Sequence, residues 1–490
     1  MKAFKNKHWV ILLLAILVNS TMMFARPQKA ITEVFRNGFV DAADFGFKPD
    51  ASGVENAMAL QKAIDNTGTI IVSQPGTYKL ANTVYIGSNT TLKFGNGVFL
   101  KKVNQTGDFS HVILNKGALT KIYDENIVIE GLNIIVNGVD VRKFKEAYGL
   151  HGQLAFFYVK DLRIDRFRCL DLGKWQYGIQ ICTFEDINVN DVIIRGEKDG
   201  VHLGRGKRFT ISNGIFQTYD DAIALNAHDY ATGNPEMGWI ENGVVSNCYD
   251  LDADNTTGFF CRILGGAWTD WKEGMEVQQS DAVVSNGKVY RVQAKPDGTF
   301  YKSFTRPTHE SGSKVLDRIK WGVVQNDVVY NAGVRNVVFR DIFLEKPRIA
   351  FSIHFDNDRF SRSFYPGATA IMQEQLLFDN VRVLYKEPKD FLSINTPVDV
   401  VTITNSSFGA GGIHFHGNKA LENYFKTTLN LNACTFNYPD TMKLLVNSVA
   451  GKEIVLKTTS SIFNSGSFTP LIVTGKGNIK QFGDLNCIEK

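Results

Sequence analysis

The sequence predicts an all-β protein folded as a right-handed parallel β-helix, with an N-terminal capping helix and a small inserted β module. A short phrase of β-branched or aromatic residues alternating with Asn, Asp or Ser recurs along the chain, as in residues 185–193 and 400–408. The phrase recurs in steps of 22–29 residues, the length of one coil of a solenoid. Equivalent positions are expected at Ile164, Val189, Ile211 and Ile240 and, later, at Phe378, Ile403, Leu431 and Leu456.

Two other architectures fit this repeat less well. An antiparallel sandwich would show turn signals about every 8–12 residues, which is shorter than the observed period. Helical arrays would show an amphipathic helical period inside each repeat, and the repeats lack it. In a parallel β-helix, coils stack about 4.8 Å apart and the inward-facing residues form one continuous core.

The first 25 residues are expected to be a secretory signal peptide. A basic start with Lys2, Lys5 and Lys7 precedes the apolar run 9–18, and a small residue, Ala25, follows. The run is too short to span a membrane, which takes about 20 residues. The mature protein is therefore expected to be secreted or periplasmic, without a membrane span.

The remaining composition excludes several classes of protein. With 44% hydrophobic residues and no Gly-X-Y period, the chain is neither disordered nor collagen-like. Removal of residues 1–25 takes away three Lys and lowers the net charge from +4 to 4 − 3 = +1. A nucleic-acid partner is not expected, because it normally requires a concentrated basic surface.

The capping helix is expected over residues 52–65. Ser52 and Glu55 have the spacing of a capping box, in which each side chain accepts a hydrogen bond from the other residue's backbone N–H. The helix should cover the open end of the first coil. The apolar positions at helical spacing are Ala57, Met58, Leu60 and Ile64.

This N-terminal region resembles the pectate-lyase-like β-helix superfamily. The resemblance rests on residues 44–50, on the helix, and on the segment 72–78. It implies a β-helix from about residue 40 and an activity on carbohydrate, since most members are polysaccharide hydrolases or lyases. The coils are expected over residues 40–262 and 330–490.

The repeat is interrupted in the middle of the chain. Ile240 and Phe339 are 99 positions apart, and part of the segment between them has a different character. We expect a small β insertion at 268–322. Its Trp and Tyr side chains either form the core of the module or stack on sugar faces.

Three acidic residues stand one coil apart. Asp199 precedes Asp220 by 21 residues and Asp221 by 22 residues. Stacked coils therefore bring the three carboxyl groups together, and at least one pKa should rise. A protonated carboxyl group beside a carboxylate is the requirement for glycoside hydrolysis.

The same segments resemble a narrower family. Residues 198–203 and 219–225 are similar to the Asn-Thr-Asp-Gly and Gly-Asp-Asp-Cys-Ile motifs of polygalacturonase-like hydrolases, glycoside hydrolase family 28. Residues 255–264 resemble the family's Arg-Ile-Lys motif. The resemblance implies inverting hydrolysis without a metal or cofactor, with catalytic Asp199, Asp220 and Asp221 and with Arg262 binding the substrate.

The sequence also departs from that family. The His-Gly motif expected between Asp221 and Arg262 is missing, and Leu264 replaces a Lys that holds galacturonate. A neutral galactoside or another polysaccharide or oligosaccharide is therefore as compatible as galacturonan. The residues expected to replace the missing substrate contacts are His202, Asn226 and His228.

Two other functions remain open. In a polysaccharide lyase, the three Asp would hold Ca²⁺ and Arg262 would abstract a proton. In a carbohydrate-binding β-helix, the missing motif would mark lost chemistry. His414 and His416 alternate on one strand face, but two histidines do not make a complete ligand set, so no metal is predicted.

Overall fold

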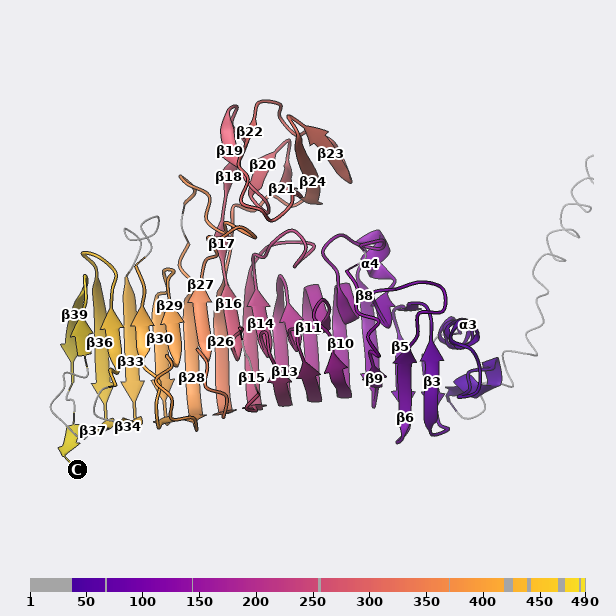
Figure 1. Cartoon of the computed structure of the whole chain (residues 1–490), viewed down its shortest axis with the longest axis horizontal. Coiled ribbons are helices and arrows are strands. Elements are labelled where there is room, and N and C mark those ends of the chain that lie inside the picture. The colour runs from indigo at the N-terminus through magenta and orange to yellow at the C-terminus, as the bar shows by residue number, and fades with distance from the viewer. Residues whose placement is uncertain are drawn as a thin grey trace, which may run out of the picture.

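The chain winds into a right-handed parallel β-helix, as the repeat predicts (Figure 1). The computed structural model describes residues 38–66, 68–142, 144–253, 257–369, 371–417, 426–438, 442–465, 472–483 and 486–489. The expected signal peptide lies outside the described residues. No helix within these ranges is both long enough and apolar enough to cross a membrane.

The coils stack in parallel register along the central part of the chain. Ile164 pairs with Val189, and Val189 pairs with Ile211, as the repeat predicts. Ile211 then pairs with Val245, so the predicted equivalence with Ile240 is wrong. The central strands are β10 (Gly152–Leu172), β11 (Tyr177–Gly196), β12 (Val201–Leu203), β13 (Gly206–Thr218), β14 (Ile223–Asn226), β15 (Ile240–Asp250) and β16 (Cys261–Leu264).

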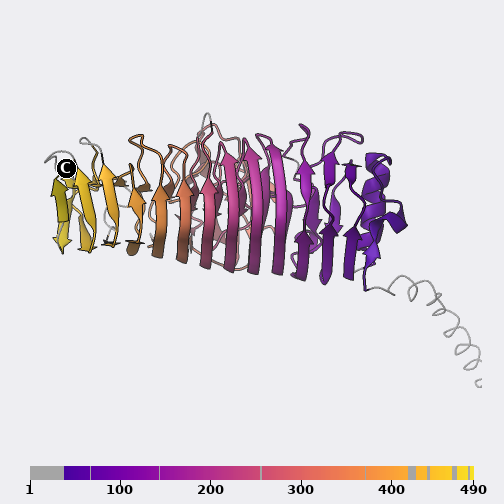
Figure 2. The same cartoon turned by 90° about the horizontal axis from the view of Figure 1, so that it is seen from below.

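A similar shift of register occurs near the C-terminus. Leu431 pairs with Thr458, whereas the repeat predicted Leu456. Both Leu456 and Ile240 still face the core, because several positions of each coil are apolar and a sequence repeat alone cannot choose among them. Regular stacking of the coils is visible from below in Figure 2.

Polar residues with positive φ form the corners between the faces of the helix. Asp161, Asp186 and Arg208 occupy one corner on successive coils, with φ of 49°, 55° and 59°. Asn242 and Asn336 continue it with φ of 58° and 54°. Asn and Asp tolerate this left-handed conformation better than other residues with a Cβ atom, which explains the polar part of the repeated phrase.

Helix α3 (Gly53–Ile64) covers the first coil at one end of the molecule (Figure 1). The predicted capping box of Ser52 and Glu55 is present. Leu60 and Ile64 are buried, but Met58 is exposed, so its assignment to the buried face is wrong. The remaining N-terminal elements are β1 (Val40–Asp41), η1 (Ala42–Phe45), β2 (Gly68–Val72), β3 (Gly76–Leu80), β4 (Val84–Ile86), β5 (Thr90–Phe94), β6 (Val98–Lys102), β7 (Ile113–Asn115), α4 (Gly117–Thr120), β8 (Asp124–Glu130) and β9 (Asn133–Ile135).

A small β module projects from the middle of the solenoid (Figure 1). Strand β15 pairs directly with β26 (Val334–Leu344), so the main ladder continues past the module. Trp271, Tyr290 and Trp321 are buried in a separate core, so these side chains pack the module. Its strands are β17 (Gly266–Ala267), β18 (Thr269–Asp270), β19 (Met275–Val277), β20 (Ala282–Ser285), β21 (Lys288–Val292), β22 (Tyr301–Ser303), β23 (Ser313–Leu316), β24 (Ile319–Gln325) and β25 (Asn331–Ala332).

The C-terminal coils carry a ladder of stacked aromatic side chains. Phe408 stacks on Phe436, and Phe436 stacks on Phe463, with ring centroids 4.8 Å and 5.0 Å apart. Each buried Phe contributes about 1.5–3 kcal/mol relative to exposure. The strands are β27 (Phe351–His354), β28 (Glu374–Val383), β29 (Leu392–Ile394), β30 (Val400–Thr404), β31 (Ser407–Phe408), β32 (Ile413–Phe415), β33 (Thr427–Asn432), β34 (Thr435–Tyr438), β35 (Leu445–Asn447), β36 (Glu453–Thr459), β37 (Ile462–Ser465), β38 (Ile472–Thr474), β39 (Asn478–Phe482) and β40 (Asn486–Glu489).

Candidate functional site

The candidate site lies on one face of the solenoid, where the short strands β12, β14, β16 and β27 follow one another. His202 pairs with Ala224, Ala224 with Arg262, and Arg262 with Ser352. Because side chains alternate along a strand, the neighbours of His202 point into the core while His202 and Arg262 point outward. The acidic residues stand in the turns that lead into these strands.

The structure brings the three predicted carboxyl groups together. One oxygen each of Asp199, Asp220 and Asp221 lies within 4.8 Å of the others. The backbone N–H of Gly200 donates to the carbonyl of Asp221 at 2.9 Å, so the two turns stack as adjacent coils. The side chain of Asp220 is 27% exposed, whereas that of Asp199 is only 4% exposed.

A cation lies among these carboxyl groups. The ammonium group of Lys198 is 3.3 Å from Oδ1 of Asp199 and also contacts Oδ2 of Asp220. Burial lowers the pKa of Lys198, but Asp199 and its neighbours outweigh this and raise the pKa above its ordinary value. Lys198 is therefore protonated, and it neutralises part of the charge of Asp199 and Asp220.

The surroundings of Asp221 and Asp199 give these two buried carboxyl groups different charge states. Burial raises the pKa of Asp221 to about 6, and the nearby charge of Asp199 adds to the effect. Burial acts in the same direction on Asp199, but Lys198 and a hydrogen bond from His202 hold its pKa well below the ordinary range. The site therefore contains a carboxyl group that keeps its proton in mildly acidic solution, next to a permanent carboxylate.

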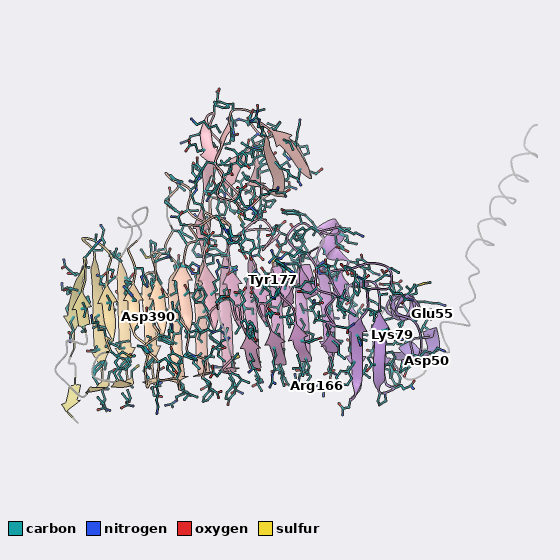
Figure 3. The ribbon with its side chains drawn as sticks, viewed as in Figure 1. Asp50, Glu55, Lys79, Arg166, Tyr177 and Asp390 are labelled. Carbon is teal, nitrogen blue, oxygen red and sulfur yellow. The ribbon has the colours of Figure 1, made fainter. Side chains whose placement is uncertain are left out.

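His202 is held between two carboxylates. Its Nδ1 lies 2.9 Å from Asp199, and its Nε2 lies 3.4 Å from Asp229. Burial lowers the pKa of His202, yet the hydrogen bonds to these carboxylates raise it above its ordinary value. Tyr177 is buried on the preceding coil, below the inserted module (Figure 3). Its ring stacks on that of His202, with ring centroids 4.0 Å apart. His202 is thus held in one orientation at the back of the site, where the two carboxylates favour its protonated form.

Asn226 is connected to His202 through Asp229. Its side-chain amide donates to Asp229 at 2.9 Å, and its carbonyl oxygen Oδ1 is buried without a hydrogen-bond partner. The side-chain oxygen of Asn234 lies 3.1 Å from Nε2 of His202. Asn226 therefore helps to orient Asp229 and, through it, His202.

Arg262 forms the opposite side of the group. It donates to Oδ1 of Asp356 at 2.7 Å, and its Nε lies 3.4 Å from His354. Burial lowers the pKa of Arg262, but Asp356, Asp229 and Asp221 raise it well above its ordinary value. The side chain of Arg262 is 17% exposed, so part of it is accessible to solvent.

His228 does not join the carboxyl groups. Among the hydrogen bonds of the described residues, none links His228 to Asp199, Asp220 or Asp221. Its ring is buried beside Trp268 at the base of the inserted module, with ring centroids 5.9 Å apart. Burial, and then the charge of Arg291, lower its pKa to about 4, so the ring is neutral near pH 7.

A cavity of about 340 Å³ lies beside the acidic turn. Phe259 lines this cavity, and its backbone N–H donates to Oδ1 of Asp221 at 2.9 Å. Arg348, another lining residue, donates to the backbone carbonyl of Asp220. The other lining residues are Thr257, Gly258, Pro347, Ile349, Pro388, Lys389 and Asp390.

The comparison with known families agrees with this architecture. Residues 39–249 match the sequence model described as "Rhamnogalacturonase A/epimerase, pectate lyase-like". This part of the chain is similar to pectate lyase-like proteins. The matched region contains the three Asp and His202 but ends before Arg262. No curated protein sequence matches the chain.

Solved structures resemble this chain over most of its length. The A-module of mannuronan C-5 epimerase AlgE4 from Azotobacter vinelandii aligns with a TM-score of 0.51 at 10% identity, over 92% of this chain and 100% of that module. A family 28 exopolygalacturonase from Yersinia enterocolitica gives 0.46 at 12% identity, over 90% and 78%. The adhesin PfbA of Streptococcus pneumoniae gives 0.48 at 12% identity, over 90% of each chain. The epimerase module shows that the β-helix fold is shared.

Several residues of the site were not assigned a role from the sequence. Lys198 stands next to Asp199, and Asp229 stands next to His228, so proximity in the chain was a signal for both. Asp356 had no such signal, because it lies 94 residues after Arg262 with the inserted module between them. Tyr177 meets His202 only because their coils are adjacent.

Proposed function

We propose that the protein is a glycoside hydrolase that cleaves a polysaccharide or oligosaccharide. The observation that carries the proposal is the pair formed by Asp221, whose pKa is raised to about 6, and the ionised Asp199 beside it. A buried carboxyl group that keeps its proton can protonate the leaving glycosidic oxygen. The family match supports a carbohydrate substrate.

In this mechanism, Asp221 acts as the general acid. Asp220, the most exposed of the three, accepts the proton of the attacking water. Lys198 and His202 keep Asp199 ionised, because each contacts one of its oxygens, at 3.3 Å and 2.9 Å. Arg262 faces the same group and is proposed to bind hydroxyl or carboxylate groups of the substrate.

We propose an inverting course of reaction. Both oxygens of Asp199 contact Lys198 or His202, so Asp199 offers no free oxygen for a covalent bond to sugar. Asp220 contacts Lys198 through Oδ2 only, and it is proposed as the base that takes the proton of the water. One oxygen of each carboxyl group lies within 4.8 Å of the others, closer than the roughly 6.5–9.5 Å typical of inverting enzymes. An inverting reaction therefore requires Asp220 and Asp221 to separate when glycan and water enter.

Lys198 argues against a calcium-dependent lyase. Its ammonium group occupies the space among the carboxylates that Ca²⁺ would need, and its raised pKa keeps it charged. A lyase product would absorb in the ultraviolet and its formation would stop with a chelator, whereas hydrolysis would show neither property. A binding-only β-helix would retain glycan without releasing product.

The deciding experiment is a screen of product release from pectic and neutral glycans, followed by the Asp221→Asn variant on the active substrate. The amide cannot donate the proton, so we expect turnover to fall by about 10²–10⁴-fold. Asp161→Asn is the matched control, because Asp161 is an exposed corner residue whose left-handed conformation suits Asn. Full turnover by Asp221→Asn would exclude the mechanism.

A further inference from the structure

A second cluster of polar side chains lies farther along the solenoid, on the same outward face. His414 and His416 lie on either side of the buried Phe415, and Asp390 precedes β29 on the preceding coil. Leu392 of β29 pairs with Ile413 of β32, which brings the two coils into register. Figure 3 shows Asp390 on the C-terminal half of the solenoid, well separated from Tyr177 of the candidate site.

The three side chains converge on one point. One ligand atom each of Asp390, His414 and His416 lies within 4.8 Å of the others. Nδ1 of His414 is 3.7 Å from Oδ2 of Asp390, and the two imidazole rings have centroids only 3.6 Å apart. The two imidazoles and the carboxylate therefore present their nitrogen and oxygen atoms to the same small space.

A hydrogen bond orients the first imidazole. Nε2 of His414 lies 3.0 Å from the hydroxyl of Ser448, which leaves Nδ1 facing Asp390. When Nε2–H donates to Ser448, Nδ1 carries a lone pair directed toward a carboxylate oxygen. Such a pair of acceptors is stable when a cation lies between them, and metal-binding histidines commonly have this kind of hydrogen bond on the other nitrogen.

We propose that Asp390, His414 and His416 bind one zinc ion. Two imidazoles and one carboxylate are a common zinc ligand set, with bonds of about 2.0–2.2 Å, so the ligand atoms of a tetrahedral ion lie about 3.3–3.6 Å apart. The ligand atoms here lie within 4.8 Å of one another and therefore need to approach by at most about 1.5 Å. All three residues are partly exposed, so an ion has access and keeps a coordination position toward solvent.

The proposed zinc site lies beside the cavity next to the acidic turn. Asp390 lines the cavity of about 340 Å³ together with Lys389 and Arg348. A zinc ion on this cluster would therefore lie at the edge of that cavity, on the side away from the three catalytic candidates. The acidic triad differs from this site, because its ligands are oxygens only and Lys198 lies among them.

The test uses the full mature chain, stripped with a chelator and then dialysed against zinc. We expect elemental analysis to give one zinc per chain, and Co²⁺ substitution to give absorption bands of a nitrogen and oxygen ligand field. Ser448→Ala should weaken zinc binding by about 10–100-fold, as loss of an outer hydrogen bond does elsewhere. Asp390→Asn and His416→Gln should weaken it further.

The Asp221→Asn variant serves as the control for location, since it alters the acidic triad and leaves this cluster unchanged. It should bind one zinc ion as the unaltered chain does. If a ligand variant fails to fold, the thermal stability of the unaltered protein still reports on the site, because zinc that binds only the native state must raise the melting temperature. No zinc retained and no thermal shift, or zinc retained by Asp390→Asn and His416→Gln, would overturn the proposal.

Discussion

The ammonium group of Lys198 lies 3.3 Å from the carboxylate of Asp199, at the centre of the acidic turn. It also contacts Asp220. This arrangement neutralises part of a charge cluster that would otherwise repel itself, and it decides which carboxyl group remains ionised. The chemistry proposed for the site depends on it.

Replacing this lysine should change what the site binds. In Lys198→Ala, three carboxyl groups remain without their cation, and we expect them to bind Ca²⁺ with a dissociation constant of about 10⁻⁴–10⁻³ M, as weak oxygen-ligand sites do. Hydrolysis should fall in the same variant because Asp199 loses its main cationic neighbour. Isothermal titration with Ca²⁺ measures the gain, and the unaltered protein is the reference. Equal calcium binding at this site by both proteins would contradict the proposed place of Lys198.

The pH dependence of turnover should follow Asp221. Its pKa is raised to about 6, so the protonated fraction, and with it kcat, should fall as the pH rises through about 6. The raised pKa also affects folding. The folded state binds this proton more tightly than the unfolded chain, whose carboxyl pKa is about 3.9, so the resulting stability is complete below about pH 4 and is lost as the pH rises through 6.

The pH dependence of kcat and that of folding stability can both be measured on the unaltered protein and on Asp221→Asn. Denaturant unfolding from pH 4 to 8 should show a loss of stability around pH 6 that is smaller in Asp221→Asn. A kcat that stays constant between pH 5 and 8 would argue against Asp221 as the acid.

The stereochemistry of the product tests the assignment of the base. If water attacks with Asp220 as base, the first sugar released has the opposite anomeric configuration from the substrate. Proton NMR of the reaction within the first minutes distinguishes the two anomers before they equilibrate. Retention would mean that one of the carboxylates attacks the sugar directly, in agreement with the short spacing of at most 4.8 Å.

A buried ion pair between Arg348 and Asp250 supports the acidic turn. Arg348 donates to both oxygens of Asp250, at 3.0 Å and 2.7 Å, and to the backbone carbonyl of Asp220 at 2.9 Å. Arg348→Met leaves Asp250 charged and buried, so the free energy of unfolding should fall by about 3–5 kcal/mol. Denaturant titration measures this, and Arg340→Met at an exposed position is the matched control. An unchanged unfolding midpoint would show that the pair does not stabilise the turn.

Export of the protein is a separate prediction. The basic and apolar start of the chain predicts cleavage after Ala25. Mass spectrometry of the protein recovered outside the cytoplasm should give a chain that begins at Arg26, with 465 residues, since 490 − 25 = 465. Recovery of the uncleaved chain from the cytoplasm would contradict the prediction.

The sequence by itself determined the solenoid and the meeting of the acidic residues. Coil length is a property of the chain, and parallel stacking converts a separation of 22 residues into contact, so Asp199 and Asp221 could be paired without a structure. The capping box of Ser52 and Glu55 could also be predicted, because it depends only on residues three positions apart. Met58 was misassigned because helical spacing alone does not fix the width of the buried face.

Only the tertiary structure decided which groups complete the site and how they are charged. The inserted module separates Arg262 from Asp356 along the chain. The length of the module does not reveal which residues of the coils before and after it lie side by side. Asp390 likewise meets His414 only through the pairing of β29 with β32. Burial separates the pKa of Asp221 from that of Asp199, and burial is a property of the folded surroundings. Local spacing therefore predicted where the carboxyl groups lie, whereas their ionisation depends on neighbours that only folding brings together.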